Sequence, residues 1–295
     1  MMIMKTFEKS FIKNQSAMEY LMTYGWSILI IAVVLGALSF LGIFNPITFA
    51  PKANPGSCQI VKNTQLGISN LVGSCNNQVP QYVAQFSNSL ITMNTSNLMN
   101  QHFTITLWFY EPSYPNLSGT YPTVGVGNGF VYGVMYLLPT SGDNNGGVTV
   151  GNYPNENYLP NPSPPTRVWN FVAATYNGTQ ISVYRGSNKE NYLSYNGPVD
   201  YSYSIAVIGG VSGYNELSTG NYLLSNIQIY NTSLTNSSLK ALYQEGIGGV
   251  PIDPQRLVGW WPLNGDANDY SGNNNNGVPT NVLYISDWYR GYVQP

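Results

Sequence analysis

The segment from Tyr20 to Phe44 contains no charged residue and no proline, and it constrains the chain more than any other feature. At about 1.5 Å rise per residue, a helix of this length exceeds the roughly 30 Å hydrocarbon core of a bilayer. A cleaved secretory signal, the alternative interpretation, has an apolar core of only about 7–15 residues. The segment therefore predicts one membrane-spanning helix over residues 20–44, preceded by a leader over residues 1–19.

The charges on either side of this segment predict its orientation. Lys5, Lys9 and Lys13 precede it, and the next basic residue is Lys52. Basic residues concentrate on the cytoplasmic side of membrane helices. We therefore expect a single-pass protein of the cell membrane, with a cytoplasmic N-terminus and everything after Asn45 outside the cell.

Two cysteines follow the helix closely, Cys58 and Cys75, and the chain has no others. Outside the cell a disulfide between them is favoured, and it would contribute about 3 kcal/mol to stability. Residues 45–80 also hold prolines and turn residues, which predicts a stalk or disulfide-stapled linker. With His102 as the only histidine, a zinc site of the usual Cys/His type is excluded.

Five Asn-x-Ser/Thr triplets lie on the predicted outer side and would permit N-glycosylation. They begin at Asn94, Asn116, Asn177, Asn231 and Asn236.

The residues just before the apolar segment, from Lys13 to Glu19, resemble the class III signal peptides of archaeal type IV pilin-like proteins. In that family a leader is cut before a Gln-x-x-x-Glu stretch and the helix is retained. The resemblance implies cleavage between Asn14 and Gln15, which makes Glu19 the fifth residue of the mature chain. It also implies assembly with like subunits in a filament, where this glutamate neutralises a neighbouring N-terminal amine. Asn14 departs from the small residue usual before the cut, so an ordinary signal anchor stays as the alternative.

Beyond the helix, the chain is poor in charge and rich in Tyr, Asn, Gly, Ser, Thr and Pro. High aromatic content with low charge argues against disorder. Alternating β-branched and aromatic residues predict many short strands with turns between them, which is typical of an antiparallel sandwich. The strands are expected at 82–86, 89–93, 103–110, 132–137, 147–150, 168–176 and 180–184, with a turn at Asn177-Gly178 and a Pro-rich loop over 152–165.

Three segments resemble laminin-G-like, concanavalin-A-like jelly rolls: residues 103–110, 169–184 and 223–243. The last is the most specific, because in that family a final strand runs into a short helix in this pattern. The resemblance implies a mainly β jelly roll over 81–245. Arg185-Gly186-Ser187 departs from the family's usual Asp-Gly turn, which suggests a longer hairpin there.

The C-terminal extension, 246–295, contains Trp260, Trp261 and an Asp/Asn-rich stretch that look like the opening of such a domain. It is too short for a second jelly roll. One interpretation is that its strands complete the first sandwich and bury Trp260 or Trp261. The alternative is a truncated repeat with an exposed edge that pairs with another subunit.

Laminin-G-like domains often carry calcium, and Asp266, Asp269 and Asn273 offer the oxygen ligands that calcium prefers. A second candidate is the stretch from Asp143 to Gly147. Clusters of Asn, Asp and Gly are also common in simple turns, which is the competing interpretation for both.

The composition narrows the function. No Glu-x-Asp-x-Glu spacing and no Ser-His-Asp set can be identified, so catalysis, including the glycoside hydrolysis found in this broad fold, is disfavoured. An acidic pI of about 5.3 with few basic residues argues against nucleic-acid binding. We expect a non-catalytic surface adhesin that recognises a glycan or a cell-surface protein through exposed Tyr, Trp and Asn side chains. The alternative is a structural, pilin-like filament subunit.

Overall fold

A computed structural model describes residues 3–40, 44, 46–63, 65–76, 78–94, 102–112, 121–126, 132–138, 147–152, 157–160, 164–197, 205–211, 216–217 and 221–295. The chain divides into two compact units, Met1–Ala50 and Pro51–Pro295. We call the second unit the β-domain.

The N-terminal unit consists of helix α1 (Ile3–Phe40) and the short helix α2 (Pro46–Phe49). The helix predicted for 20–44 is thus present within α1, but it begins inside the predicted leader and ends at Phe40. Several large apolar side chains described on α1 are exposed, among them Tyr20, Trp26 at 66 % and Phe40. In the part of the chain that the structure describes, no helix combines the length and the hydropathy needed to cross a membrane. The membrane span and its orientation stay predictions.

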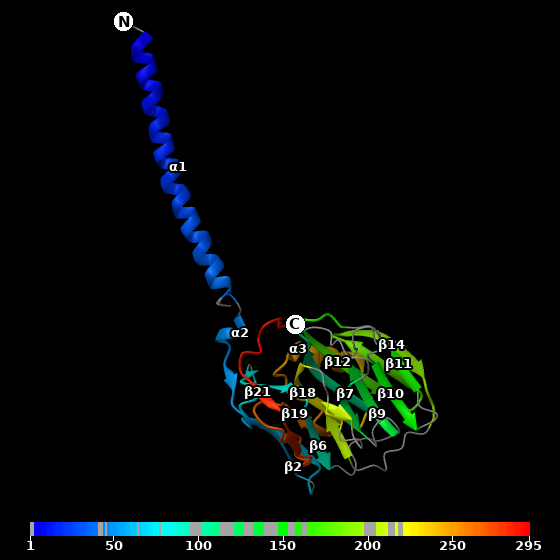
Figure 1. Cartoon of the computed structure of the whole chain (residues 1–295). Helices are drawn as coiled ribbons and strands as arrows, with labels where there is room; N and C mark the ends of the chain where they lie inside the picture. The colour runs from blue at the N-terminus through cyan, green and yellow to red at the C-terminus, as the bar shows by residue number, and fades with distance from the viewer. Residues whose placement is uncertain are drawn as a thin grey trace. The chain divides into compact units, whose positions relative to one another are not determined.

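The β-domain is a sandwich of two antiparallel sheets, which confirms the fold class predicted for it (Figure 1). The eight-stranded sheet has the order β14-β13-β12-β7-β18-β5-β21, and β19 also pairs with β18. Its strands are β5 (Val83–Phe86), β7 (Phe103–Tyr110), β12 (Trp169–Tyr176), β13 (Gln180–Arg185), β14 (Asn188–Ser194), β18 (Tyr222–Tyr230), β19 (Leu257–Trp261) and β21 (Leu283–Ile285).

The seven-stranded sheet has the order β11-β10-β9-β8-β15-β6-β20. Its strands are β6 (Leu90–Asn94), β8 (Tyr121–Val126), β9 (Tyr132–Leu138), β10 (Gly147–Asn152), β11 (Asn157–Pro160), β15 (Ile205–Ile208) and β20 (Gly277–Thr280). Three smaller pairs accompany the sheets: β1 (Lys52–Ala53) with β4 (Val79–Pro80), β2 (Cys58–Asn63) with β3 (Ile68–Gly73), and β16 (Gly210–Val211) with β17 (Glu216–Leu217).

The core lies between the two sheets and is built by strand alternation. In β7 the side chains that enter it are Phe103, Ile105, Leu107 and Phe109. The intervening residues, such as Trp108 at 2 % exposure, point the other way and are buried too. The centre of the eight-stranded sheet is therefore covered on both faces, which explains why β7 and β12 are buried along nearly their whole length.

The second covering layer consists of α3 (Asn236–Glu245) and the C-terminal residues (Figure 1). Thr235 caps the helix by accepting a hydrogen bond from the Ser238 N–H, and Leu239 and Leu242 are its buried residues. Trp108 stacks on Tyr243 with ring centroids 5.9 Å apart. Aromatic rings continue this layer at Trp169, Phe171, Trp288 and Tyr292.

The C-terminal extension adds strands to both sheets, so the structure adopts the first of the two arrangements considered for it. β19 pairs with β18, β20 with β6 and β21 with β5. Trp261 is fully buried in the inter-sheet core, and Trp260 is 3 % exposed on the other side of its strand. Both tryptophans are therefore buried.

Two sequence expectations in this region of the sandwich are wrong. The Pro-rich loop contains a strand, β11, because Leu159 fits the core and the strand pairs with β10. The hairpin at Arg185 is short: Arg185 pairs with Asn188, and Gly186 takes the left-handed conformation (φ 55°) that a tight turn requires.

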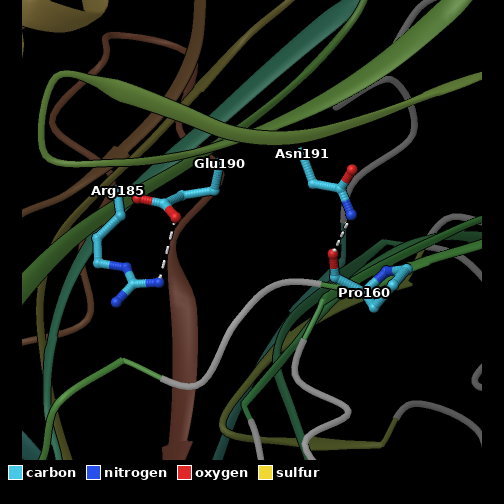
Figure 2. A network of polar contacts seen from close by, with 4 residues as sticks. All are labelled: Pro160, Arg185, Glu190 and Asn191. Atoms are coloured by element: carbon cyan, nitrogen blue, oxygen red, sulfur yellow. Dashed lines mark hydrogen bonds and ion pairs between the residues drawn. The ribbon is translucent and has the colours of Figure 1, made fainter.

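The outer strands β11 and β14 approach each other where the two sheets meet. Figure 2 shows the Asn191 side chain of β14 reaching the Pro160 carbonyl of β11, with 2.9 Å between the amide nitrogen and the oxygen. Beside it, Arg185 and Glu190 point toward each other and form an ion pair at 3.5 Å. This pair is partly exposed, so we expect it to contribute little to stability.

The predicted disulfide between Cys58 and Cys75 is confirmed. It closes the β2–β3 hairpin, which belongs to the β-domain and not to a separate stalk. Ile60 anchors this hairpin with 2 % exposure, and its backbone N–H donates to the Tyr270 carbonyl (2.8 Å).

Candidate functional site

A cleft lies where the base of the disulfide-closed hairpin meets strands β18 and β19, and we call it the disulfide cleft. Its cavity volume is about 50 Å³. The walls come from segments 53–58, 74–75 and 247–250, and from Gln78 and Pro80. The middle of β18, at Asn226, and the end of β19 with the turn that follows complete them. Segments that are distant in the sequence therefore build one site.

Close backbone contacts at two glycines shape the cleft. A Cβ on Gly73 would lie 2.0 Å from the Ser57 carbonyl oxygen, and Gly73 has a positive φ of 105°. A Cβ on Gly248 would lie 2.4 Å from the Gln78 carbonyl oxygen. Only glycine fits at these positions, so the hairpin base and the segment after α3 can close around the cleft.

Asn226 lies in the wall formed by β18, and it interrupts the regular strand. Its backbone has a positive φ of 50°, and the β18–β7 register shifts between Ser225 and Gln228. Asparagine tolerates this conformation better than most residues. The side-chain amide donates to the Gly249 carbonyl (2.7 Å), and its oxygen accepts from Trp260 Nε1 (2.9 Å). Asn226 thus fixes both the 247–250 segment and the indole that lines the cleft.

The chemistry of the cleft is neutral. Among the described residues that line it, none is charged, and apolar groups predominate. Asn54 and Ser74 bring an exposed amide and an exposed hydroxyl to it, and Ser57 brings a second hydroxyl. Such a lining suits a neutral group with both apolar and hydrogen-bonding atoms.

The Asp/Asn-rich turn predicted to bind calcium adjoins the cleft, but Asp269 acts as a hydrogen-bond acceptor within the turn. Asp269 Oδ1 accepts from the backbone N–H groups of Trp260 (2.9 Å) and Ser271 (2.8 Å). Its Oδ2 accepts from Ser271 Oγ and from the Asn275 N–H, both at 2.9 Å. The carboxylate is 8 % exposed, so these donors satisfy a nearly buried charge.

The other two predicted calcium ligands are also engaged. Asp266 Oδ2 accepts from the Tyr270 hydroxyl (2.7 Å), and burial followed by this hydrogen bond raises the pKa of Tyr270 to about 12. Asn273 Oδ1 accepts from Lys62 Nζ (3.2 Å), a cation that also donates to the Leu257 carbonyl. Burial lowers the pKa of Lys62, while the charge of Asp269 acts in the opposite direction. A lysine ammonium and a saturated Asp269 do not fit a calcium ion.

We expect Asp269→Ala to lower the free energy of unfolding by about 3 kcal/mol, because buried donors lose their acceptor. Urea unfolding of the full chain measures this loss. Asp266→Ala, in the same turn, is the matched control and should cost less. Addition of calcium or a chelator should leave both midpoints unchanged. A calcium-dependent rise in stability that disappears in Asp269→Ala would show that the turn does hold the ion.

The remaining predicted site residues divide by where they lie. Asn177 and Asn236 are exposed, at the β12–β13 turn and the start of α3, while Asn231 is half-buried with its Oδ1 enclosed. The structure does not describe Asn116 or the stretch 143–146. It also does not describe the side chains of Asn94, Asn14, Gln15 and Glu19. Glycosylation and leader processing stay predictions.

The sequence predicts exposed tryptophans as ligand contacts, and the described part of the β-domain has none. Every tryptophan there is buried, and Trp169 is the most exposed at 7 %. Within the described part of the β-domain, the exposed tyrosines lie at the outer strands: Tyr192 on β14 and Tyr158 on β11. The tryptophans pack the core and the second layer because large aromatic surfaces contribute most when they leave water.

The described acidic residues do not gather into a cluster of potential metal ligands. Within the described residues, no group of three or more His, Cys, Asp or Glu side chains comes together. Glu111, after β7, is 3 % exposed, and its Oε2 has no hydrogen-bond partner. Burial raises the pKa of Glu111 from 4.5 to about 7.

Comparison with known proteins agrees with this architecture. A family model described as Laminin_G_3, of the concanavalin A-like lectin/glucanases superfamily, matches residues 86–240, just over half of the chain. No curated protein sequence matches. Among solved structures, a presumed carbohydrate-binding protein from Bacteroides ovatus is similar with a TM-score of 0.54 at 14% identity, covering 74% of this chain and 67% of that one.

Two further structures show weaker similarity. A heptameric SAP-like pentraxin from Limulus polyphemus has a TM-score of 0.44 at 14% identity, with 70% of this chain and 90% of that one covered. Domain 4 of a GH43 extracellular arabinanase from Geobacillus stearothermophilus, in complex with arabinotriose, has a TM-score of 0.42 at 16% identity, with 62% and 86% covered. At such identities these similarities concern the fold alone.

Proposed function

Because the chain belongs to the concanavalin A-like lectin/glucanase superfamily through its laminin-G-type domain, we propose that it is a non-catalytic, glycan-binding protein of the cell surface. The observation that carries this proposal is a lectin-type sandwich with an uncharged cleft of mixed apolar and hydrogen-bonding lining. A presumed carbohydrate-binding protein has a similar fold, which supports a glycan as the ligand. A cell-surface protein is the alternative ligand.

The arrangement of carboxylates supports binding without catalysis. Retaining and inverting glycosidases need two carboxyl groups about 5–10 Å apart on either side of the bond that is cut. In the described part of the β-domain, Glu111 is enclosed, Glu190 pairs with Arg185, and Asp269 is saturated by backbone donors. No described carboxylate lines the disulfide cleft, so the cleft offers neither member of such a pair.

We place the β-domain outside an archaeal-type cell, held by α1 as a membrane anchor. The uncharged segment from Tyr20 to Phe44 and the lysines before it support this topology. The disulfide between Cys58 and Cys75 supports it independently, since such bonds persist in oxidising surroundings outside the cytoplasm.

Two measurements on the full chain test the proposed function. Purified protein in detergent, applied to an array of neutral and acidic oligosaccharides, should bind a subset of the glycans. On intact cells, an external protease should remove the β-domain while the N-terminus stays with the membrane fraction. Absence of binding to every glycan would contradict the lectin role, and recovery of the chain in the cytoplasmic fraction would contradict the topology.

A structural filament subunit is the second candidate function. The continuous helix α1, 38 residues long and beginning before Gln15, supports it because a pilin-like subunit needs one long helix for assembly. Mass spectrometry of the mature N-terminus tests this candidate. A chain that begins at Gln15 supports processing of the pilin type, whereas an N-terminus at Met1 or Met2 contradicts it.

A further inference from the structure

We propose that the disulfide cleft binds the edge of a neutral sugar residue at the end of a glycan chain. This inference rests on the proposed glycan-binding function and names the place and the chemistry of recognition. Three features of the cleft carry it: its size, its lack of charge and the way its walls are held.

The size of the cleft favours a chain end. A cavity of about 50 Å³ is far below the roughly 300–1,000 Å³ of pockets that enclose a whole small ligand. It has room for about three to five water molecules, at roughly 10–15 Å³ for each. A hydroxyl or hydroxymethyl edge of one terminal sugar fits this space, with the rest of the chain leaving through the open side.

The lining favours a neutral sugar over an acidic one. Pro80, Val250 and Trp260 provide apolar surface for sugar C–H groups, while Asn54, Ser57 and Ser74 provide hydrogen-bonding groups. A uronic or sialic acid would have to bring its carboxylate into this lining, where no described residue is cationic. Burial of an unpaired charge has a large desolvation cost, so the cleft should bind acidic sugars more weakly than neutral ones.

The walls are fixed in place before a ligand arrives. The disulfide holds Cys58 against Cys75, and Asn264 donates to the Ala53 carbonyl (2.8 Å), which fixes the segment that contains Asn54. Trp260 is fixed through its backbone N–H by Asp269 and through its indole by Asn226. A preorganised site loses less entropy on binding, which suits recognition of a small group.

Ser74→Trp tests the proposal because Ser74 is exposed at the cleft and a bulky ring there would fill it without disturbing the core. Asn70→Trp is the matched control: Asn70 is exposed on the same hairpin, on β3, and does not line the cleft. Asn54→Trp is a second blocking variant, because Asn54 is also exposed and lines the cleft. Each variant is compared with the unmodified full chain in detergent, and an unchanged unfolding midpoint shows that it is folded.

The probes are oligosaccharides ending in glucose, galactose, mannose or N-acetylglucosamine, together with counterparts ending in uronic or sialic acid. We expect binding to one or more neutral chain ends, a loss of affinity of about tenfold or more in both blocking variants, and no change in Asn70→Trp. If both blocking variants still bind glycan, the cleft is not the binding site, and the proposed glycan-binding function still holds. If the unmodified chain binds no glycan, or binds only peptides, the proposed function itself fails. Equal or stronger binding of acidic ends would overturn the inferred ligand class.

Discussion

Trp261→Ala is expected to lower the free energy of unfolding of the β-domain by about 4 kcal/mol, the largest effect of any single substitution considered. Trp261 is fully buried in the core between the sheets, and its indole N–H donates to the Asn275 carbonyl (3.0 Å). The variant would lose the burial of the indole, leave a cavity and leave that carbonyl without its donor. Urea unfolding followed by far-UV circular dichroism would measure the change.

Trp26→Ala is the control for this experiment, because Trp26 lies on α1, is 66 % exposed and belongs to the other unit. It should leave the unfolding of the β-domain unchanged. The Trp261 result tests whether the C-terminal extension unfolds together with the sandwich. If Trp261→Ala cost less than about 1 kcal/mol, β19 would not belong to the cooperative unit and the pairing of β19 with β18 would contribute little.

The sequence predicts the central strands well because the same side chains that favour a strand locally are also the ones that the core buries. β7 occupies the predicted residues 103–110, and the strand at 223–230 does run into a helix, α3. In both strands alternation and β-branched or aromatic content agree with the burial that follows. The hairpin turn at Asn177-Gly178 also forms, with Gly178 at φ 87°.

Other features depend on contacts that no local pattern contains. β11 lies in a stretch whose prolines and asparagines indicate a loop, and it becomes a strand only because β10 offers an edge and the core accepts Leu159. The burial of both faces of β7 requires α3 and the C-terminal aromatic residues, which follow more than 100 residues later. The alternation of residues within β7 therefore cannot predict a covering layer formed by residues so far away in the sequence.

The candidate site, too, has one part that local sequence predicts and one part that depends on distant contacts. The disulfide between Cys58 and Cys75 can be predicted because two nearby cysteines leave one pairing. The cleft cannot, since its lining comes from segments as far apart as Ala53 and Tyr270. The sequence of β18 contains one local signal, because Ser225, Asn226 and Gln228 interrupt its apolar residues. Polar side chains inside a buried strand indicate a special backbone conformation or a buried hydrogen-bond network. Asp269 is a residue type that binds metal ions, which is why the sequence predicts a calcium ligand there. The backbone N–H groups that occupy its carboxylate come together only in the folded chain.

The second large effect concerns Glu111, whose carboxyl group is enclosed at the end of β7. It is 3 % exposed, its Oε2 lacks a hydrogen-bond partner, and burial raises its pKa from 4.5 to about 7. The folded protein therefore holds the proton more tightly than the unfolded chain does. The stability that comes from this difference is fully present below about pH 4.5, falls as the pH rises toward 7, and is lost above that value.

Glu111→Gln should remove this pH dependence, because the amide stays neutral throughout. Between pH 4.5 and 8 the unmodified protein should lose on the order of 3 kcal/mol of unfolding free energy through Glu111, at about 1.4 kcal/mol per pKa unit. The variant should lose correspondingly less and should be the more stable of the two at pH 8. Glu245→Gln, on the exposed side of α3, is the control and should follow the unmodified protein at every pH. Urea midpoints measured from pH 4.5 to 8 decide the matter: parallel curves for all three proteins would mean that Glu111 titrates as a solvated carboxyl group, and that the end of the sandwich is open to water.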